Sequence, residues 1–393
     1  MSAPAAESAR RARIAVSAGF AGQGFAYATV LTSLEGFKDR YGIDDGQVTL
    51  VVLGVCLMAA VGTVVADRVA RTAGGSRIVL GAGLLIVAAA VVVAAVAPVF
   101  AVLALGFAVY GVGLGMVDAG TNMQAVAIQR EYGRSLLTGF YASWSVGGIA
   151  GAVFVAATVG RTPTDPVAVA LLAGTLVAVL AAVGVLRAGW RVTVPVRADG
   201  VARPDEALAL PVSGGSKPVV PWGAVLLLGL GDVLLAAASF APLGYAAYLT
   251  TTLASRLAGD PLVRRWGRVV VLRTGALVGA AGLVLVVAAP GPWAGLAGFA
   301  VAGAGLGVIA PLCFSAAGDL APGHADAVVA RLNIFNYVGA VLGGVLVGAI
   351  GSTSSLHYGF AVPIVLVVVV AIFAGRFGVT RHTAAPVTAG AGA

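Results

Sequence analysis

The sequence predicts an all-α membrane protein in which twelve transmembrane helices form two parallel six-helix repeats. Three observations predict this class: many apolar stretches of spanning length, basic residues confined to alternate loops, and features of the first half that recur in the second. Hydrophobic residues make up 60% of the 393 residues and charged residues only 10%. A water-soluble chain of this composition would lack the polar side chains needed to cover its surface.

The expected spans follow from hydropathy. A helix needs about 20 mainly apolar residues to cross the hydrocarbon core, because lipid cannot satisfy backbone hydrogen bonds. Stretches of about this length are expected at 14–34, 47–65, 78–97, 100–128, 136–159, 166–187, 219–238, 241–258, 269–289, 294–317, 329–350 and 358–375. The seventh and eighth share residues 219–258, so the helix 7 to 8 region is shortened and Phe240-Ala241-Pro242 is its turn.

The basic residues orient these spans. When the N-terminus is placed in the cytoplasm, all 24 Lys and Arg residues face the cytoplasm except Lys38, Arg40 and Arg161. This is the positive-inside pattern, and it predicts a multi-pass protein in a lipid bilayer with both termini cytoplasmic. The net charge of +8 arises from short loops and helix ends. Since no soluble basic module is present, nucleic-acid binding is not expected.

A polar segment divides the chain. Residues 188–218 are rich in charge, proline and glycine, which indicates a cytoplasmic linker. We therefore expect an N-terminal bundle at 1–187, a C-terminal bundle at 219–376 and a flexible cytoplasmic tail at 377–393.

The two halves repeat one another, which is the second decisive pattern. Three pairs recur at nearly constant offset: Asp67 and Arg71 with Asp260 and Arg264, Gly113-Leu114-Gly115 with Gly305-Leu306-Gly307, and Gly147-Gly148 with Gly343-Gly344. Because the expected spans give both halves the same orientation, the repeat is parallel.

Two parallel six-helix repeats joined by a cytoplasmic linker resemble the major facilitator superfamily (MFS), over nearly the whole chain. The segment from Gly62 to Arg71, GTVVADRVAR, resembles the family's Gly, Asp-Arg, Gly-Arg signature, with Ala70 in place of the second glycine. The run from Gly113 to Ala152 resembles a bacterial, sugar-permease-related branch of mostly unknown substrate. Its matching polar positions are Asn122, Gln124, Arg134, Tyr141 and Ser145. The resemblance implies the MFS fold, a bacterial inner (plasma) membrane location and secondary transport.

Charged residues at the cytoplasmic helix ends form a candidate gate. Asp67 is flanked by Arg68 and Arg71, and Asp260 by Arg256, Arg264 and Arg268. At such helix ends, ion pairs and helix dipoles can link neighbouring spans. The resemblance implies that these loops hold the cytoplasmic gate shut. The candidate gate residues are Asp67, Arg68, Arg71, Arg134, Asp260, Arg264 and Arg268. Alternatively, they are solvent-exposed charges that only orient the spans, each contributing about 0 to 1 kcal/mol to stability. In the loop that contains Asp260, Pro261 replaces the arginine of the signature.

Carboxylates inside spans need an explanation, because a central aspartate costs about 2.5 to 3.5 kcal/mol on insertion scales. Asp232 lies near the middle of 219–238 and is the first candidate for a proton carrier. The alternative is a structural ion pair or exposure to water between the halves. Asp118 is the second candidate, and it shares a helix face with Asn122, so it either lines the pathway or binds the Arg130 to Arg134 loop.

Polar and aromatic residues four apart mark the faces of a substrate pathway. Aromatic rings beside amides suit a sugar or another small polar solute. The candidates are Gln23, Tyr27, Asn122, Tyr141, Trp144, Asn333 and Asn336. Taken singly, a Tyr or Trp is more often an interfacial anchor.

These observations favour a monomeric secondary active transporter that moves a small solute by alternating access, with protons as the candidate coupling ion. No cofactor or metal site is expected, since Cys56 and Cys313 are the only cysteines and both lie in expected spans. The sequence contains no group of residues typical of a catalytic site, so an enzyme is not expected. The alternatives are a polyspecific exporter of drugs or metabolites and a non-transporting membrane sensor that retains the fold.

Overall fold

The computed structural model describes residues 3–72, 74–158, 166–190, 241–320, 325–351 and 361–377. Every regular element within these ranges is helical. The elements are α1 Ala3–Thr32, α2 Leu34–Tyr41, α3 Asp45–Ala70, α4 Gly75–Val96, α5 Phe100–Tyr132, α6 Leu137–Thr158, α7 Pro166–Ala188, α9 Ala241–Trp266, α10 Arg268–Val287, α11 Pro292–Leu306, α12 Ile309–Leu320, α13 Ala325–Gly351, α14 Ala361–Phe373 and the 3-10 helix η2 Ala374–Phe377.

Eight helical segments of the described ranges are long and apolar enough to cross a membrane. Their outward surfaces are apolar as well, and the exposed side chains include Leu105, Leu180 and Leu277. Such surfaces suit lipid, in which apolar groups carry no hydration penalty. The chain is therefore a multi-pass helical membrane protein. The expected span 219–238, most of the linker 188–218 and nearly all of the tail 377–393 lie outside the described residues.

The helices differ from the expected spans mainly at their ends. Helix α1 begins at Ala3, and the unexpected short helix α2 follows it, with Gly42 as its left-handed C-cap. Helix α9 continues through Pro261 to Trp266, well beyond the expected end at 258. The reason is that hydropathy reports the lipid-facing part of a helix, whereas polar residues extend it into water.

Glycines allow some helices to touch backbone to backbone. In α6, a Cβ added to Gly147 would lie 1.9 Å from the carbonyl oxygen of Ala21 in α1. A Cβ at Gly24 of α1 would lie 2.1 Å from the carbonyl oxygen of Trp144 in α6. Only a residue without a side chain permits this approach, which is common between membrane helices.

The two Gly-Leu-Gly motifs pack in corresponding ways. A Cβ at Gly115 of α5 would meet the backbone of α3, and one at Gly113 would meet α4. Likewise, a Cβ at Gly307 would meet the backbone of α9, and one at Gly305 would meet α10. Each motif thus lets one helix approach two neighbours at once.

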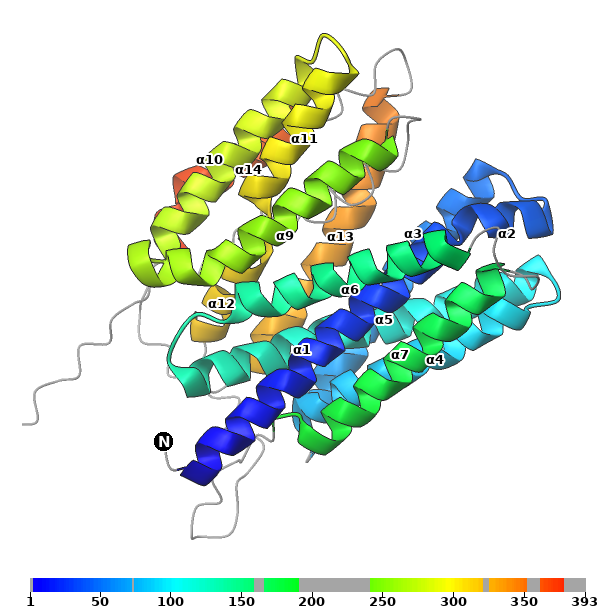
Figure 1. The fold of residues 1–393 in the computed structure, drawn as a ribbon, viewed down its shortest axis with the longest axis horizontal. Coiled ribbons are helices and arrows are strands. Elements are labelled where there is room, and N and C mark those ends of the chain that lie inside the picture. The colour runs from blue at the N-terminus through cyan, green and yellow to red at the C-terminus, as the bar shows by residue number, and fades with distance from the viewer. Residues whose placement is uncertain are drawn as a thin grey trace, which may run out of the picture.

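Figure 1 shows α1 to α7 gathered in one group and α9 to α14 in another. The groups meet where α6 packs against α9 and where α3 packs against α13. Contacts of α5 with α12 and α13, and of α6 with α12, also belong to this interface. We call this interface between the two groups of helices the seam, and the candidate site lies along it.

Candidate solute site between the two groups of helices

A cavity of about 260 Å³ lies between the two groups of helices. Its lining comes from α1, α2, α3, α5 and α6 on one side and from α9, α12 and α13 on the other. A volume of this order holds one small molecule. All seven residues that the sequence assigned to the pathway line this cavity: Gln23, Tyr27, Asn122, Tyr141, Trp144, Asn333 and Asn336.

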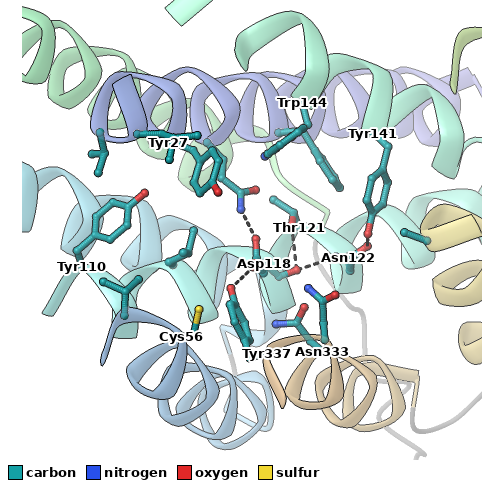
Figure 2. A pocket seen from close by; sticks show the side chains of 18 of the residues that line it. Tyr27, Cys56, Tyr110, Asp118, Thr121, Asn122, Tyr141, Trp144, Asn333 and Tyr337 are labelled. Carbon is teal, nitrogen blue, oxygen red and sulfur yellow. Dashed lines mark hydrogen bonds between the residues drawn. The ribbon is translucent and has the colours of Figure 1, made fainter. Parts of the chain in front are cut away.

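Asp118 of α5 lies at the centre of the cavity lining (Figure 2). Its Oδ1 accepts a hydrogen bond from Nε2 of Gln23 in α1. Its Oδ2 accepts one from the hydroxyl of Tyr337 in α13, which belongs to the other group of helices. One carboxylate therefore joins three helices and bridges the seam.

Asn122 continues the polar wall one helical turn further along α5. Its Nδ2 donates to the backbone oxygen of Asp118 at 2.9 Å, and its Oδ1 accepts from the hydroxyl of Tyr141 in α6 at 3.0 Å. On the same wall, the rings of Tyr27 and Trp144 lie 5.9 Å apart between centroids. Aromatic faces and amide groups thus alternate around the cavity, as Figure 2 shows.

The two asparagines of α13 differ in their contacts. Asn333 is 1% exposed, and its Nδ2 donates to the hydroxyl oxygen of Thr63 in α3 at 2.9 Å, again across the seam. Oδ1 of Asn336 is buried and accepts no hydrogen bond among the described residues. A buried acceptor without a donor is unusual, and here it lies in the lining of the cavity. A solute hydroxyl would satisfy it.

Arg256 of α9 also lines the cavity. Its Nη1 donates to Oγ of Ser145 at 2.7 Å and its Nε to the backbone oxygen of Gly307 at 3.2 Å. Its guanidinium carbon lies 5.3 Å from the ring centroid of Tyr141 and 5.6 Å from that of Trp144. These contacts fix a cationic side chain against two aromatic residues of the other group of helices.

At one end of the seam, Asp260 of α9 caps the N-terminus of α6. Its carboxylate accepts from Oγ of Ser135 at 2.7 Å, from the amide of Thr138 at 3.3 Å and from the amide of Gly139 at 2.8 Å. The side chain is 7% exposed. An anion at this position satisfies the unpaired amides of a helix start and interacts well with its dipole. This contact ties the two groups of helices together.

Further contacts close the same end. Nε2 of Gln129 in α5 donates to Oγ of Ser315 in α12 at 2.7 Å. At the start of α13, ahead of the apolar stretch 329–350, the pKa of Asp326 is raised to about 6, chiefly because the carboxyl is partly buried; Arg130 lowers this pKa and Asp67 raises it. We call the region around Gln129, Asp260 and Ser315 the sealed end.

The other candidate gate residues lie near the sealed end without forming one network. Asp67 pairs with Arg71 of its own chain segment at 2.7 Å, and Arg68 is exposed. Arg134 is exposed and lies over the ring of Tyr132. Arg264 donates weakly to the backbone oxygen of Ser135 at 3.5 Å, and Arg268 pairs with Asp319 at 2.6 Å.

The structure also brings residues to the cavity that sequence analysis did not assign to it, chiefly Arg256, Tyr110 and Tyr337. Arg256 had been grouped with the charges around Asp260, because the expected span ended at residue 258. Asp232, the first candidate for proton coupling, lies outside the described residues. Within the described part of the chain, no group of three His, Cys, Asp or Glu side chains is placed to hold a metal ion.

A polar cavity between two groups of membrane helices is typical of solute carriers, and comparisons specify the family. The family model described as Major Facilitator Superfamily matches residues 222–393. An uncharacterised MFS-type transporter of Yersinia pestis is 28% identical over 280 residues, which cover 67% of this chain and 69% of that protein. The uncharacterised transporter y4wD of Sinorhizobium fredii (strain NBRC 101917 / NGR234) is 30% identical over 272 residues, covering 65% and 69%.

Solved structures show the same fold. The MFS transporter FucP in the outward conformation matches with a TM-score of 0.75 at 13% identity, covering 93% of this chain and 98% of FucP. A variant of FucP, described as the fucose:proton symporter of E. coli, matches with a TM-score of 0.67, also at 13% identity, and covers 93% and 98%. The chain belongs to the major facilitator superfamily, and this membership indicates a transporter.

Proposed function

We propose that this protein is a secondary transporter of the bacterial inner membrane, which carries a small polar solute through the cavity around Asp118 by alternating access. A single observation carries this proposal: both groups of helices line one cavity, and the contacts of Gln129, Asp260 and Ser315 close the seam at one end of it. The cavity lining extends from Asp118 past Leu34 and Val51, toward the end of α1 that is remote from its N-terminus. With a cytoplasmic N-terminus, the cavity faces the outside.

Proton coupling is the second part of the proposal, with Asp118 as the carrier. Its carboxylate accepts hydrogen bonds from Gln23 in one group of helices and from Tyr337 in the other. Protonation removes the negative charge that strengthens both bonds. The bond across the seam then weakens, so proton binding changes how firmly the groups hold together. Asp232 remains a second candidate carrier.

The solute is small and polar. Ring faces of Tyr27 and Trp144 with the amide groups of Asn122 and Asn336 fit a sugar-like ring, which offers an apolar face and hydroxyl edges. A structural relative, FucP, is described as a fucose:proton symporter.

Transport by the full-length protein in proteoliposomes tests this function. With an inward proton gradient, we expect at least one of L-fucose, D-xylose, D-glucose and D-gluconate to accumulate above its external concentration. A protonophore should reduce the accumulation to equilibrium. Binding of a solute without flux would instead identify a membrane sensor, and flux that ignores the protonophore would exclude proton coupling.

The sealed end yields a prediction about gating. Replacing Asp260 by Ala leaves the amides of Thr138 and Gly139 without their acceptor, which costs about 1 to 3 kcal/mol. We expect the seam to open at this end in part of the molecules. Spin labels at the exposed positions Arg134 and Arg265, in a cysteine-free background, should show an added population at longer distance.

Asp44→Ala is the matched control. It also removes a carboxylate that caps a helix start, but Asp44 caps its own helix α3, within one group of helices and away from the sealed end, so the distance between the labels should not change. If Asp260→Ala and Asp44→Ala give the same distance distribution, Asp260 does not hold the seam closed.

A further inference from the structure

We propose that the solute of this transporter is amphipathic: a small hydroxylated ring that carries a short apolar group, as in an alkyl or aryl glycoside. This inference rests on the proposed function and assigns its substrate class. It depends on the division of the cavity lining into a polar part and an apolar part at successive depths along the same helices. Figure 2 shows Tyr110 and Cys56 on one side of Asp118, and Asn122 and Tyr141 on the other.

The polar part of the lining surrounds Asp118 and includes three asparagines. Asn122 and Asn333 are already hydrogen-bonded to other side chains of the protein. Oδ1 of Asn336, by contrast, is buried and accepts no hydrogen bond among the described residues. A buried acceptor that stays unpaired is costly. We therefore assign to Asn336 a hydrogen bond from a hydroxyl of the solute ring.

The apolar part of the lining begins one helical turn before Asp118. Along α5, Phe107, Tyr110 and Leu114 precede Asp118 at spacings of three and four, so all four share one helix face. The ring of Tyr110 packs edgewise against Phe107, with 6.1 Å between the centroids. Side chains of α1, α2 and α3 continue this surface. We call apolar wall the lining side chains Val30, Leu34, Val51, Val55, Phe107 and Leu114.

A free sugar satisfies only the polar part of this cavity. Hydroxyl groups gain nothing from contact with apolar side chains, whereas an apolar group gains affinity when it leaves water for such a surface. Each methylene buried in this way raises affinity about fourfold. The cavity of about 260 Å³ holds one small molecule. The same solute must therefore meet both Asn336 and the apolar wall, and its two ends differ in chemistry.

Cys56 provides the assay, because it is half-buried and lines the cavity, whereas Cys313 is buried. In the full-length protein in lipid nanodiscs, which keep detergent out of the cavity, a bound solute should slow the alkylation of Cys56 by N-ethylmaleimide. Mass spectrometry of the labelled peptide measures the rate. The probes are the methyl, butyl and phenyl β-glycosides of D-glucose and of D-xylose.

For at least one of the two sugars, we expect the butyl and phenyl glycosides to protect Cys56 at a concentration at least about tenfold lower than the methyl glycoside. The butyl group adds three methylenes to the methyl group, and each contributes to burial against the apolar wall. n-Butanol and phenol at the same concentrations should not protect, because they lack the hydroxylated ring.

Matched variants of α3 separate the apolar wall from the outer surface of the helix. Val55→Asn places an amide in the wall and should reduce the advantage of the butyl over the methyl glycoside to about threefold or less. Val61→Asn, at an exposed position of the same helix, should leave the advantage unchanged. Because the two glycosides are compared within each variant, an effect of the substitution on the reactivity of Cys56 cancels. Asn336→Leu should weaken protection by both glycosides about three- to tenfold and keep their ratio.

The proposal is overturned if no glycoside protects, if n-butanol protects as well as the butyl glycosides, or if Val55→Asn and Val61→Asn give the same ratio. It is also overturned if methyl and butyl glycosides of both sugars protect equally. Uptake of the free sugar in proteoliposomes with that last result would keep the transport function, reject only the apolar group and assign the wall to closure of the outer end. Protection in the expected order without any flux would keep the amphipathic ligand and reject transport.

Discussion

Asp118→Asn will abolish uphill accumulation of solute while sparing exchange. Asparagine offers an oxygen to Gln23 and Tyr337 in place of the carboxylate contacts that Asp118 makes, but it does not take up a proton at physiological pH. Without a carrier, the proton gradient no longer drives the solute, so the ratio of internal to external solute should fall to about one. Radiolabelled uptake under a proton gradient and counterflow between equal solute concentrations measure the two activities separately.

Two comparisons define this experiment. Asp319→Asn removes a carboxylate that lies outside the cavity and should keep accumulation at the level of the native protein. If Asp118→Asn still accumulates solute, the proton is carried elsewhere, and Asp232→Asn becomes the next variant to measure. If Asp118→Asn loses counterflow as well, Asp118 binds the solute and its role in coupling is not separate.

Part of the cavity lining was predictable because a polar residue in an apolar stretch is costly and therefore informative. Gln23 and Tyr27 lie four residues apart, as do Tyr141 and Ser145, so each pair shares a helix face. The cavity lining includes the Gln23, Tyr27 and Tyr141 side chains. Small residues, including Gly19 and Gly22, surround the face of Gln23 and Tyr27, and small residues are typical of helix faces that pack against other helices.

Contacts across the seam were not predictable in the same way. The partner of Asp260 is the start of α6, which lies more than a hundred residues earlier in the chain, and no local pattern identifies it. The depth of Arg256 was also hidden, because hydropathy ended the expected span at 258 while the helix continues to Trp266. Composition alone assigns a charged residue near the end of an apolar stretch to the membrane–water interface. Helix α9 instead places Arg256 in the cavity wall.

The short helix α2 was missed for a different reason. Its sequence LEGFKDRY has a low hydropathy, and the capping signal of its C-terminus is the single residue Gly42. Such a segment is indistinguishable from a polar loop when only membrane spans are sought. The internal repeat, by contrast, was visible because Gly113 and Gly115 recur as Gly305 and Gly307 where helices touch closely, and close contact restricts the residue type.

Gly147→Ala will disrupt the packing of α1 against α6. The added methyl group would lie 1.9 Å from the carbonyl oxygen of Ala21, so one backbone must move, at an expected cost of about 3 kcal/mol or more. Gly148→Ala is the matched control in the same helix. Its methyl group would lie 3.7 Å from the nearest atom, the carbonyl oxygen of Gly24, and alanine favours a helix by about 1 kcal/mol over glycine.

Thermal unfolding in detergent should therefore give a lower midpoint for Gly147→Ala and an equal or higher midpoint for Gly148→Ala. The substitution also separates Tyr27 of α1 from Trp144 of α6, whose rings lie 5.9 Å apart in the cavity wall. Cys56 lines the cavity, so a bound solute should protect it from alkylation by N-ethylmaleimide. We accordingly expect Gly147→Ala to weaken this protection even where the variant remains folded. If both variants have the same midpoint of thermal unfolding, the contact between α1 and α6 is looser than the structure indicates. If solute also protects Cys56 equally in both, helix packing at this position does not shape the solute site.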